Sequence, residues 1–182
     1  MRDIPLTMLH EHLNVHSIPS FRCPDGFLVR SFVPGDDKAW ARIEAAAGAF
    51  SDAHAARRHF ATEFAPVHVR LPGRMLFLEH ETAGAIGTIT AWDQDFVGEM
   101  RGRIHWVGII PAFQGRGLSK PLLSEALKRL MLDYRQAYLT TETTSYRGIN
   151  LYINFGFVPY VTNELDREGW TILEEILGRT IL

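Results

Sequence analysis

The chain has few of the features that mark specialised classes of protein. Its 182 residues include a single cysteine, Cys23, so it can form no disulfide within the chain and is compatible with a reducing compartment. It carries 19 lysines and arginines against 21 acidic residues, a formal net charge of −2. It therefore has no basic excess of the kind that indicates nucleic-acid binding. No apolar run reaches the ~18 residues of a membrane span, so neither nucleic acid nor membrane is an expected partner.

The N-terminal residues do not have the composition of a signal peptide. Charged and polar residues such as Arg2, Asp3, His10 and Glu11 interrupt the apolar run that such a peptide requires, and the expected location is cytoplasmic. A chain of this length with 46% hydrophobic and 22% charged residues favours one globular domain with its own core. We expect an N-terminal arm over 1–25, a domain core over 26–162, and a C-terminal helix over 163–182 that packs on the same domain.

Apolar spacing and turn-forming residues predict a mixed α/β chain of the α+β kind. Residues 93–102 are polar and contain glycine, and we expect them to form a loop. A strand, a helix and a further strand in succession imply one parallel pair, whereas the hairpin over 75–92 is antiparallel. The expected strands are 26–33, 75–79, 85–92, 103–110, 137–143 and 157–161, and the expected helices are 37–48, 52–64, 117–132, 146–154 and 163–177.

The most informative segment joins an apolar strand to a helix through a loop with two glycines. It reads Gln114-Gly115-Arg116-Gly117-Leu118-Ser119-Lys120. Glycine permits tight turns and close approach of a ligand to the backbone. The first N–H groups of a helix have no partner within it and lie at the positive end of its dipole. The segment is therefore a candidate site for phosphate groups. Arg116 and Lys120 can add charge contacts, or can be ordinary solvated side chains.

Two motifs of this chain resemble those of the GCN5-related N-acetyltransferase (GNAT) family. The first is Gln/Arg-x-x-Gly-x-Gly/Ala between the family's fourth strand and third helix, matched here by Gln114–Ser119 with Ser119 in place of the small final residue. The second is Asn-x-x-Ala-x-x-Leu-Tyr-x-x-x-Gly-Phe, which aligns with residues 145–157. Here Ser145 replaces the asparagine, Gly148 replaces the alanine, and Tyr152 is kept. The order of elements agrees over residues 26–161.

This resemblance implies a GNAT-like fold: a mostly antiparallel sheet with a splayed parallel strand pair, flanked by helices. It implies acetyl-CoA as cosubstrate and direct attack by a primary amine of a small molecule or peptide. It also implies a bulge near residues 107–109 that turns the Ile109 N–H toward the thioester oxygen. No metal is expected. The implied contacts to CoA are Val107, Ile109, Ile110, Gln114, Gly115, Arg116, Gly117, Leu118, Ser119, Lys120, Ser145, Gly148 and Tyr152.

Two residues are candidates for the proton transfers of such a reaction. Tyr152 stands where the family often has its general acid, and a phenol can donate a proton to a leaving sulfur; the alternative is a packed core tyrosine. His105 is the candidate base, since histidine titrates near neutral pH. Alternation would place it on one strand face with Val107 and Ile109. The alternatives are a structural histidine, Glu142, Asp95 or a water relay.

Other functions agree less well with the order of elements. A non-catalytic acyl-CoA-binding regulatory domain would keep the loop and lose turnover. A dinucleotide-binding oxidoreductase is disfavoured, because its glycine loop follows the first strand and here the loop follows later strands. The C-terminal helix and the N-terminal arm are expected to contribute to a homodimer contact or to close the acceptor cleft.

Overall fold

The computed structural model of the protein describes residues 2–182, and these divide into two compact units. Among the described residues, the first unit comprises 2–19, 93–103 and 131–182, and the second comprises 20–92 and 104–130. The long strands β4 and β5 contribute residues to both units.

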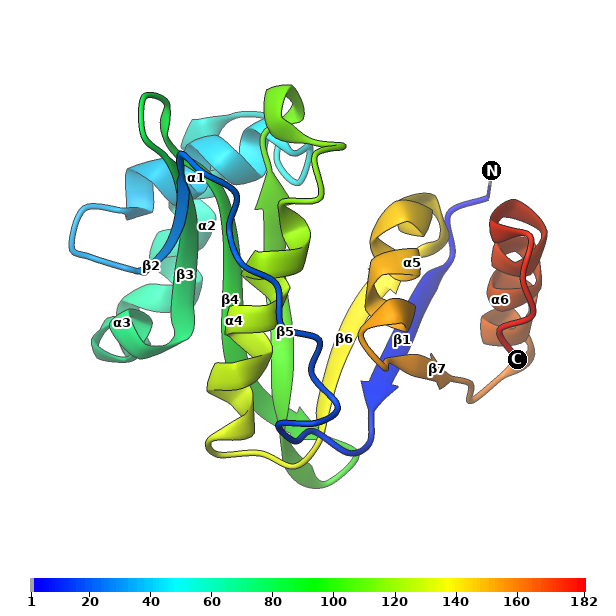
Figure 1. The fold of residues 1–182 in the computed structure, drawn as a ribbon. Helices are drawn as coiled ribbons and strands as arrows, with labels where there is room; N and C mark the ends of the chain where they lie inside the picture. Colours follow the sequence, from blue (N-terminus) through cyan, green and yellow to red (C-terminus); the bar gives the residue numbers. More distant parts are fainter. Residues whose placement is uncertain (1) are drawn as a thin grey trace. The chain divides into compact units, whose positions relative to one another are not determined.

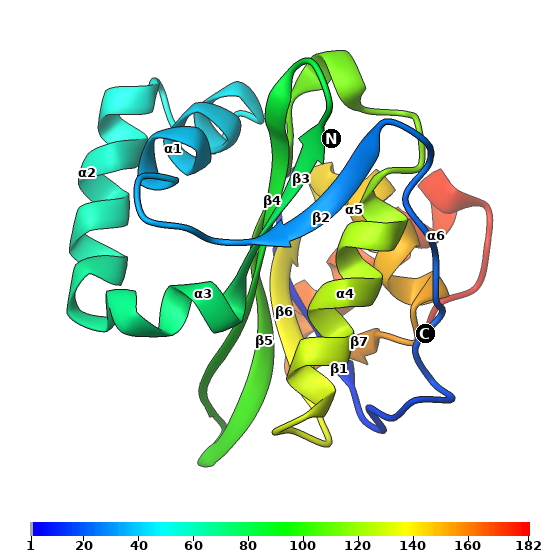
Figure 2. The ribbon, with the colours of Figure 1, turned by 60° about the vertical axis from the view of Figure 1, so that its left-hand side comes forward.

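The second unit is built on antiparallel strands with helices on both faces. Strand β3 pairs antiparallel with β2 on one side and with β4 on the other. Figure 2 shows α1 and α2 against one face of these strands and α4 against the opposite face. The elements are β2 (Phe27–Ser31), α1 (Asp37–Ala46), α2 (Ala53–Phe64), η1 (Ala65–Arg70), α3 (Leu71–Arg74), β3 (Met75–His80), β4 (Gly84–Phe96), β5 (Glu99–Ile109), η2 (Pro111–Phe113) and α4 (Ser119–Met131).

Aromatic side chains from α1 and α2 form much of the core of this unit. Trp40 on α1 is fully buried and lies edge-on to Phe60 and Phe64 of α2, with ring centroids 5.2 and 6.0 Å apart. Such edge-to-face pairs add to the burial of apolar area. The expected helix start at Asp52 is confirmed, because its carboxylate accepts the Ala55 N–H at 2.7 Å. The sequence therefore positions α1 and α2 firmly against the sheet.

The expected loop over residues 93–102 is wrong. Strand β4 continues to Phe96 and β5 begins at Glu99, joined by a two-residue turn at Val97 and Gly98. Both turn residues have positive φ, 57° and 79°, as the tight turns that suit hairpin twist require. Valine is a poor residue for that conformation, so the sequence carried no recognisable turn signal here.

The first unit surrounds strand β6 (Ala137–Glu142), which follows α4. Residues Gly102 and Arg103 of β5 pair in parallel with Ala137 and Tyr138, which confirms the expected parallel pair. Strand β1 (Pro5–His10) lies antiparallel between β6 and β7 (Val158–Tyr160). Figure 1 shows α5 (Tyr146–Asn154) and α6 (Glu164–Leu177) beside these strands. A short η3 turn (Thr143–Ser145) precedes α5.

The N-terminal segment differs from the irregular arm that the sequence predicts. Residues 5–10 form an interior strand, and Leu6 and Met8 are 2% and 0% exposed. The partners of β1 lie more than 120 residues away along the chain. A six-residue strand whose pairing is this distant leaves no local period to recognise. Over residues 2–182 the hydrogen-bonded strand order is β2-β3-β4-β5-β6-β1-β7, a mixed and mostly antiparallel sheet.

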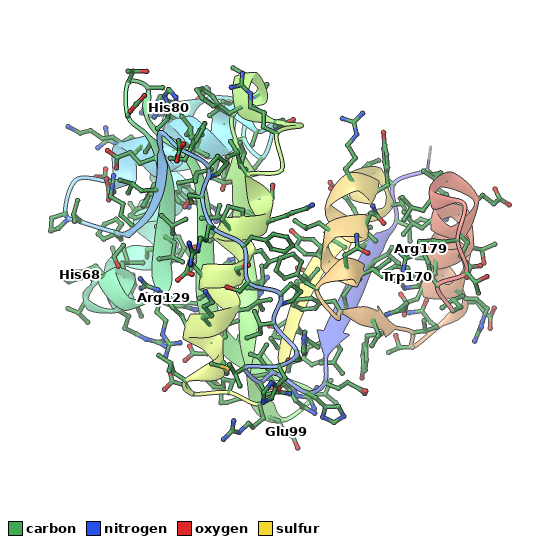
Figure 3. The ribbon with its side chains drawn as sticks, in the orientation of Figure 1. His68, His80, Glu99, Arg129, Trp170 and Arg179 are labelled. Atoms are coloured by element: carbon green, nitrogen blue, oxygen red, sulfur yellow. The ribbon has the colours of Figure 1, made fainter. Side chains whose placement is uncertain are left out.

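Helix α6 confirms the expected C-terminal helix. Asn163 accepts the Asp166 N–H at 3.0 Å, and Gly178 ends the helix with φ 62°. Trp170, labelled in Figure 3, and Leu173 are fully buried. A Cβ on Gly169 would lie 2.9 Å from Leu6 Cδ2, so α6 packs directly on the β1 segment. The helix therefore covers apolar side chains of its own unit.

Deleting residues 163–182 is expected to expose the β1 side chains and cause aggregation. The deletion removes Trp170 and Leu173 and uncovers Leu6, and a contiguous exposed apolar patch promotes association. Light scattering and thermal unfolding measure the effect. Deleting only residues 179–182, which keeps α6 and its C-terminal glycine, is the matched control and should leave the protein monodisperse. A longer deletion that stayed as stable as the control would contradict this packing role.

Candidate active site

The loop before α4 has the backbone conformation that its glycines predict. Gly115 and Gly117 have φ values of 75° and 74°, in the left-handed region that favours glycine. A Cβ built on either residue meets no atom within 4 Å, so the space beside the loop is open. Helix α4 begins at Ser119, and Pro121 lies in its first turn, as expected. The loop thus presents a helix N-terminus beside open space.

Side chains of the loop hold its shape. The Gln114 amide donates to the Ile109 carbonyl at 2.7 Å and ties the loop to the end of β5. The Arg116 guanidinium donates to the Ala112 carbonyl at 3.1 Å and lies over the Phe113 ring. Leu118 is buried, whereas residues 114–117 are exposed. Lys120 lies over the Phe21 ring, 5.3 Å from its centroid.

Strand β5, which precedes the loop, contains an irregularity one residue from the expected position. Trp106 has φ 49°, a conformation that is unusual for a bulky residue. His105 and Trp106 are adjacent, yet both bind the same carboxylate on α2, so the expected alternation of His105 with Val107 and Ile109 is interrupted. A left-handed residue places consecutive side chains on one face, as in a β-bulge. Gly108, which lies within the expected bulge region 107–109, does not have a positive φ.

Glu63 on α2 collects three hydrogen-bond donors. Its Oε1 accepts from His105 Nε2 at 2.7 Å, and its Oε2 accepts from Trp106 Nε1 and from His59 Nε2, both at 2.8 Å. Burial alone would raise the pKa of Glu63. The bonds and charge interaction with His105, the Trp106 indole and His59 outweigh burial and lower this pKa to about 2. Glu63 is therefore a carboxylate over the whole range in which histidine titrates.

Glu44 on α1 has the opposite character. It is 2% exposed, and its Oε1 has no hydrogen-bond partner among the described residues 2–182. A Cβ on Gly108 would lie 2.9 Å from that oxygen and 3.3 Å from Ile43 Cγ2, so only glycine fits at residue 108. Burial raises the pKa of Glu44 to about 7. Below pH 7, a mostly protonated carboxyl group thus packs against the backbone of β5 two residues beyond Trp106.

The Glu44→Gln variant is expected to remove a pH dependence of stability. Because burial raises its pKa from 4.5 to about 7, Glu44 binds its proton more tightly in the folded protein. Its contribution to the free energy of unfolding is complete below pH 4.5 and is lost as pH rises through 7, by about 3 kcal/mol in all. Denaturant titrations between pH 4.5 and 8 measure it. Glu81→Gln, an exposed residue, is the control; a parallel decline in wild type and Glu44→Gln would refute a buried proton.

The predicted residues of the first unit lie within α5 or directly before it. Ser145 precedes the helix, and its side chain makes no capping hydrogen bond. A Cβ on Gly148 would lie 3.6 Å from Tyr152 Cε2 and 4.0 Å from its hydroxyl, so residue 148 is adjacent to the phenol. The half-buried Tyr152 ring also meets Phe157 edge-on at 6.0 Å. Gly156, two residues after this helix ends, has φ 88°, in the left-handed region that favours glycine.

Metal binding requires a group of ligating side chains, and membrane spanning by a helix requires a long apolar helix. In residues 2–182, no three His, Cys, Asp or Glu side chains come together in a group that could hold a metal ion. No helix in that same range combines the length and apolarity needed to cross a membrane.

Burial and the charge of Glu125 raise the pKa of the Cys23 thiol, which opposes formation of a reactive thiolate.

Comparison with known proteins decides the family. A sequence profile of the Acetyltransferase (GNAT) family matches residues 39–157, which include α1, α2, β5, the glycine loop and α5. The chain belongs to the GNAT acetyltransferase family. The resemblance seen in the two motifs is thereby confirmed, as is the mixed, helix-flanked sheet.

Individual relatives agree with this family. A mycothiol acetyltransferase of Streptomyces coelicolor is 29% identical over 164 residues, covering 89% of this chain and 52% of its own length. One of Nocardia farcinica is 29% identical over 170 residues, covering 85% and 52%. A GCN5-related N-acetyltransferase structure from Sphaerobacter thermophilus gives a TM-score of 0.68 at 24% identity, covering 87% and 50%, and supports the GNAT fold. The chain spans about half the length of the curated relatives it matches.

The sequence patterns did not predict a functional role for Glu63 or Glu44. Both carried a signal in the helical spacing: Glu63 lies four residues after His59 on α2, and Glu44 lies four residues after the buried Trp40 on α1. An acidic residue in an apolar helix stripe is uncommon unless it is paired or functional. Their partners on β5 are more than 40 residues away, however, and no local pattern connects them.

Proposed function

We propose that this chain is an acetyl-CoA-dependent N-acetyltransferase that moves an acetyl group to a primary amine by direct attack. The observation that carries the proposal is the Gln114–Lys120 loop of a GNAT family member, with two left-handed glycines beside open space at the start of α4. The family match supplies the reaction class, and the loop supplies a place for the anionic part of the cosubstrate.

The residues of the loop suit the group that the family implies. A pyrophosphate needs several N–H donors converging on one space, and the first N–H groups of α4 have no acceptor within the helix. Glycine at 115 and 117 keeps that space clear of side chains. Val107 and Ile109 of β5, and Ile110 directly after it, are the proposed backbone contacts of the pantetheine arm, with the Ile109 N–H as donor to the thioester oxygen. When bound, acetyl-CoA supplies an activated acetyl group.

Two side chains are proposed to move the protons. His105 takes a proton from the attacking amine, and Tyr152 gives its phenolic proton to the leaving sulfur. Glu63 bonded to His105 supports the role of the histidine, since an ionised carboxylate stabilises the imidazolium that forms. The Gly148 position beside the Tyr152 ring supports the role of the phenol, because a small residue there leaves room at the hydroxyl.

The acceptor is proposed to be a small-molecule amine or a peptide amine. The named relatives are mycothiol acetyltransferases, so we include the acceptor of those enzymes in the proposed range. Isothermal titration with CoA tests the cosubstrate site first. The reaction is then tested by incubating the protein with acetyl-CoA and each amine of a panel, and by measuring release of the free thiol. Micromolar CoA binding with turnover on at least one amine is expected, and no CoA binding by the folded protein would refute the proposal.

A further inference from the structure

The Glu63 carboxylate connects α2 to the irregular part of β5. One oxygen accepts from the imidazole of His105, and the other accepts from the indole of Trp106. These two donors are consecutive residues, which a regular strand would direct to opposite faces. The left-handed φ of Trp106 brings them to one carboxylate. Two neighbouring side chains of the strand therefore depend on one residue of a helix.

We propose that Glu63 is a positioning residue that fixes the tautomer of His105 and holds the left-handed conformation of β5 at Trp106. This inference rests on the proposed function, in which His105 is the base. It adds to that function a residue outside both family motifs. Glu63 acts through its two neighbours on β5.

The first part of the role concerns the proton. Because Glu63 is ionised and accepts from Nε2, His105 carries its N–H on Nε2 and receives any further proton on Nδ1. When the acceptor amine forms its bond to the acetyl carbon, its proton passes to Nδ1. The Nε2–H bond to Glu63 stays in place, and the carboxylate balances the new positive charge. No proton needs to pass to Glu63.

The second part concerns the shape of the strand. A bulky non-glycine residue with positive φ is strained and persists only where its surroundings enforce it. The Trp106 indole is enclosed by rings of Trp40, Phe50 and His59, with centroids 5.3, 5.3 and 5.0 Å away. Its only polar atom donates to Glu63 at 2.8 Å. The ring contacts and this bond together hold the turned backbone that leads into Val107–Ile109.

Within the second unit, His59 of α2 and Glu44 of α1 also face this part of β5. From α2, His59 shares Oε2 of Glu63, and its ring also meets Trp106. From α1, Glu44 faces Gly108 farther along the strand. Glu63 is thus the carboxylate in direct contact with His105, and its charge acts at 2.7 Å. Removing that charge is expected to change the acidity of His105 more than any other substitution in this unit.

Two variants separate charge from shape. Glu63→Gln keeps the size of the side chain and removes its charge, whereas Glu63→Asp keeps the charge and shortens the side chain. In Glu63→Gln the NMR titration midpoint of His105 should move to lower pH by about one unit or more. In Glu63→Asp it should stay closer to that of the wild type. Glu81→Gln, which removes an exposed carboxylate, is the control and should leave the midpoint unchanged.

The pH dependence of kcat/KM gives the second readout. With an active acceptor, its acidic limb should move with the His105 midpoint in Glu63→Gln, while the affinity for CoA stays unchanged. An unchanged His105 midpoint in a folded Glu63→Gln protein would overturn the inference, as would a larger midpoint shift in Glu63→Asp than in Glu63→Gln. The NMR titration needs no turnover, so it judges Glu63 even if the amine panel fails and the proposed function with it.

Discussion

Replacing Gly117 with glutamate is expected to abolish CoA binding while the fold remains intact. The Cβ and carboxylate would enter the open space beside the N-terminus of α4, where the pyrophosphate is proposed to bind. Placing like charges together costs several kcal/mol, so the affinity for CoA should fall by at least about 100-fold. Calorimetric titration of wild type and variant with CoA measures this loss.

The control for Gly117→Glu must carry the same backbone strain and the same charge. Gly84→Glu does so, because Gly84 has φ 69°, close to the 74° of Gly117, and a Cβ there also meets nothing within 4 Å. It is the first residue of β4, directly after the turn that follows β3, and CoA affinity should be unchanged. If a folded Gly117→Glu protein bound CoA as the wild type does, the cosubstrate site would have to be sought elsewhere.

Replacing Tyr152 with phenylalanine should lower turnover by about 10²–10⁴-fold, the usual contribution of a positioned general acid. The substitution keeps the ring, its edge contact with Phe157 and its place beside Gly148, and removes only the hydroxyl. CoA affinity and the midpoint of thermal unfolding should therefore change little. Steady-state kinetics under conditions in which chemistry limits turnover give the size of the effect.

Tyr146→Phe provides the comparison for this variant. Tyr146 begins the same helix, and Arg147 lies over its ring, so the substitution also removes one hydroxyl from α5. Its rate should remain near that of the wild type. A Tyr152→Phe enzyme that was equally active would identify Tyr152 as a packing residue and leave the proton donor unassigned.

The sequence predicted those elements whose determinants are local. Asp52 and Asn163 marked helix starts because each side chain accepts an N–H three residues later. Gly115 and Gly117 marked the loop because their left-handed backbone favours glycine. The helix α4 between two strands predicted the parallel pair of β5 and β6.

Features that depend on distant partners could not be predicted from local sequence patterns. Strand β1 is recognisable only through β6 and β7, and the Val97–Gly98 turn uses a residue that ordinarily avoids positive φ. The irregularity at Trp106 depends on Glu63, which lies 43 residues earlier. The loop of the candidate site was thus predictable from sequence, whereas the carboxyl groups around β5 were not.

Amine-dependent release of CoA from acetyl-CoA is the most direct test of the proposed N-acetyltransferase activity. It is measured on the wild-type chain across the amine panel, and the product is identified by mass analysis. If the chain is an N-acetyltransferase, thiol release requires an amine and equals the amount of N-acetylated product formed. Tight binding of CoA with no turnover on any amine of the panel would contradict it and would favour a non-catalytic acyl-CoA-binding domain.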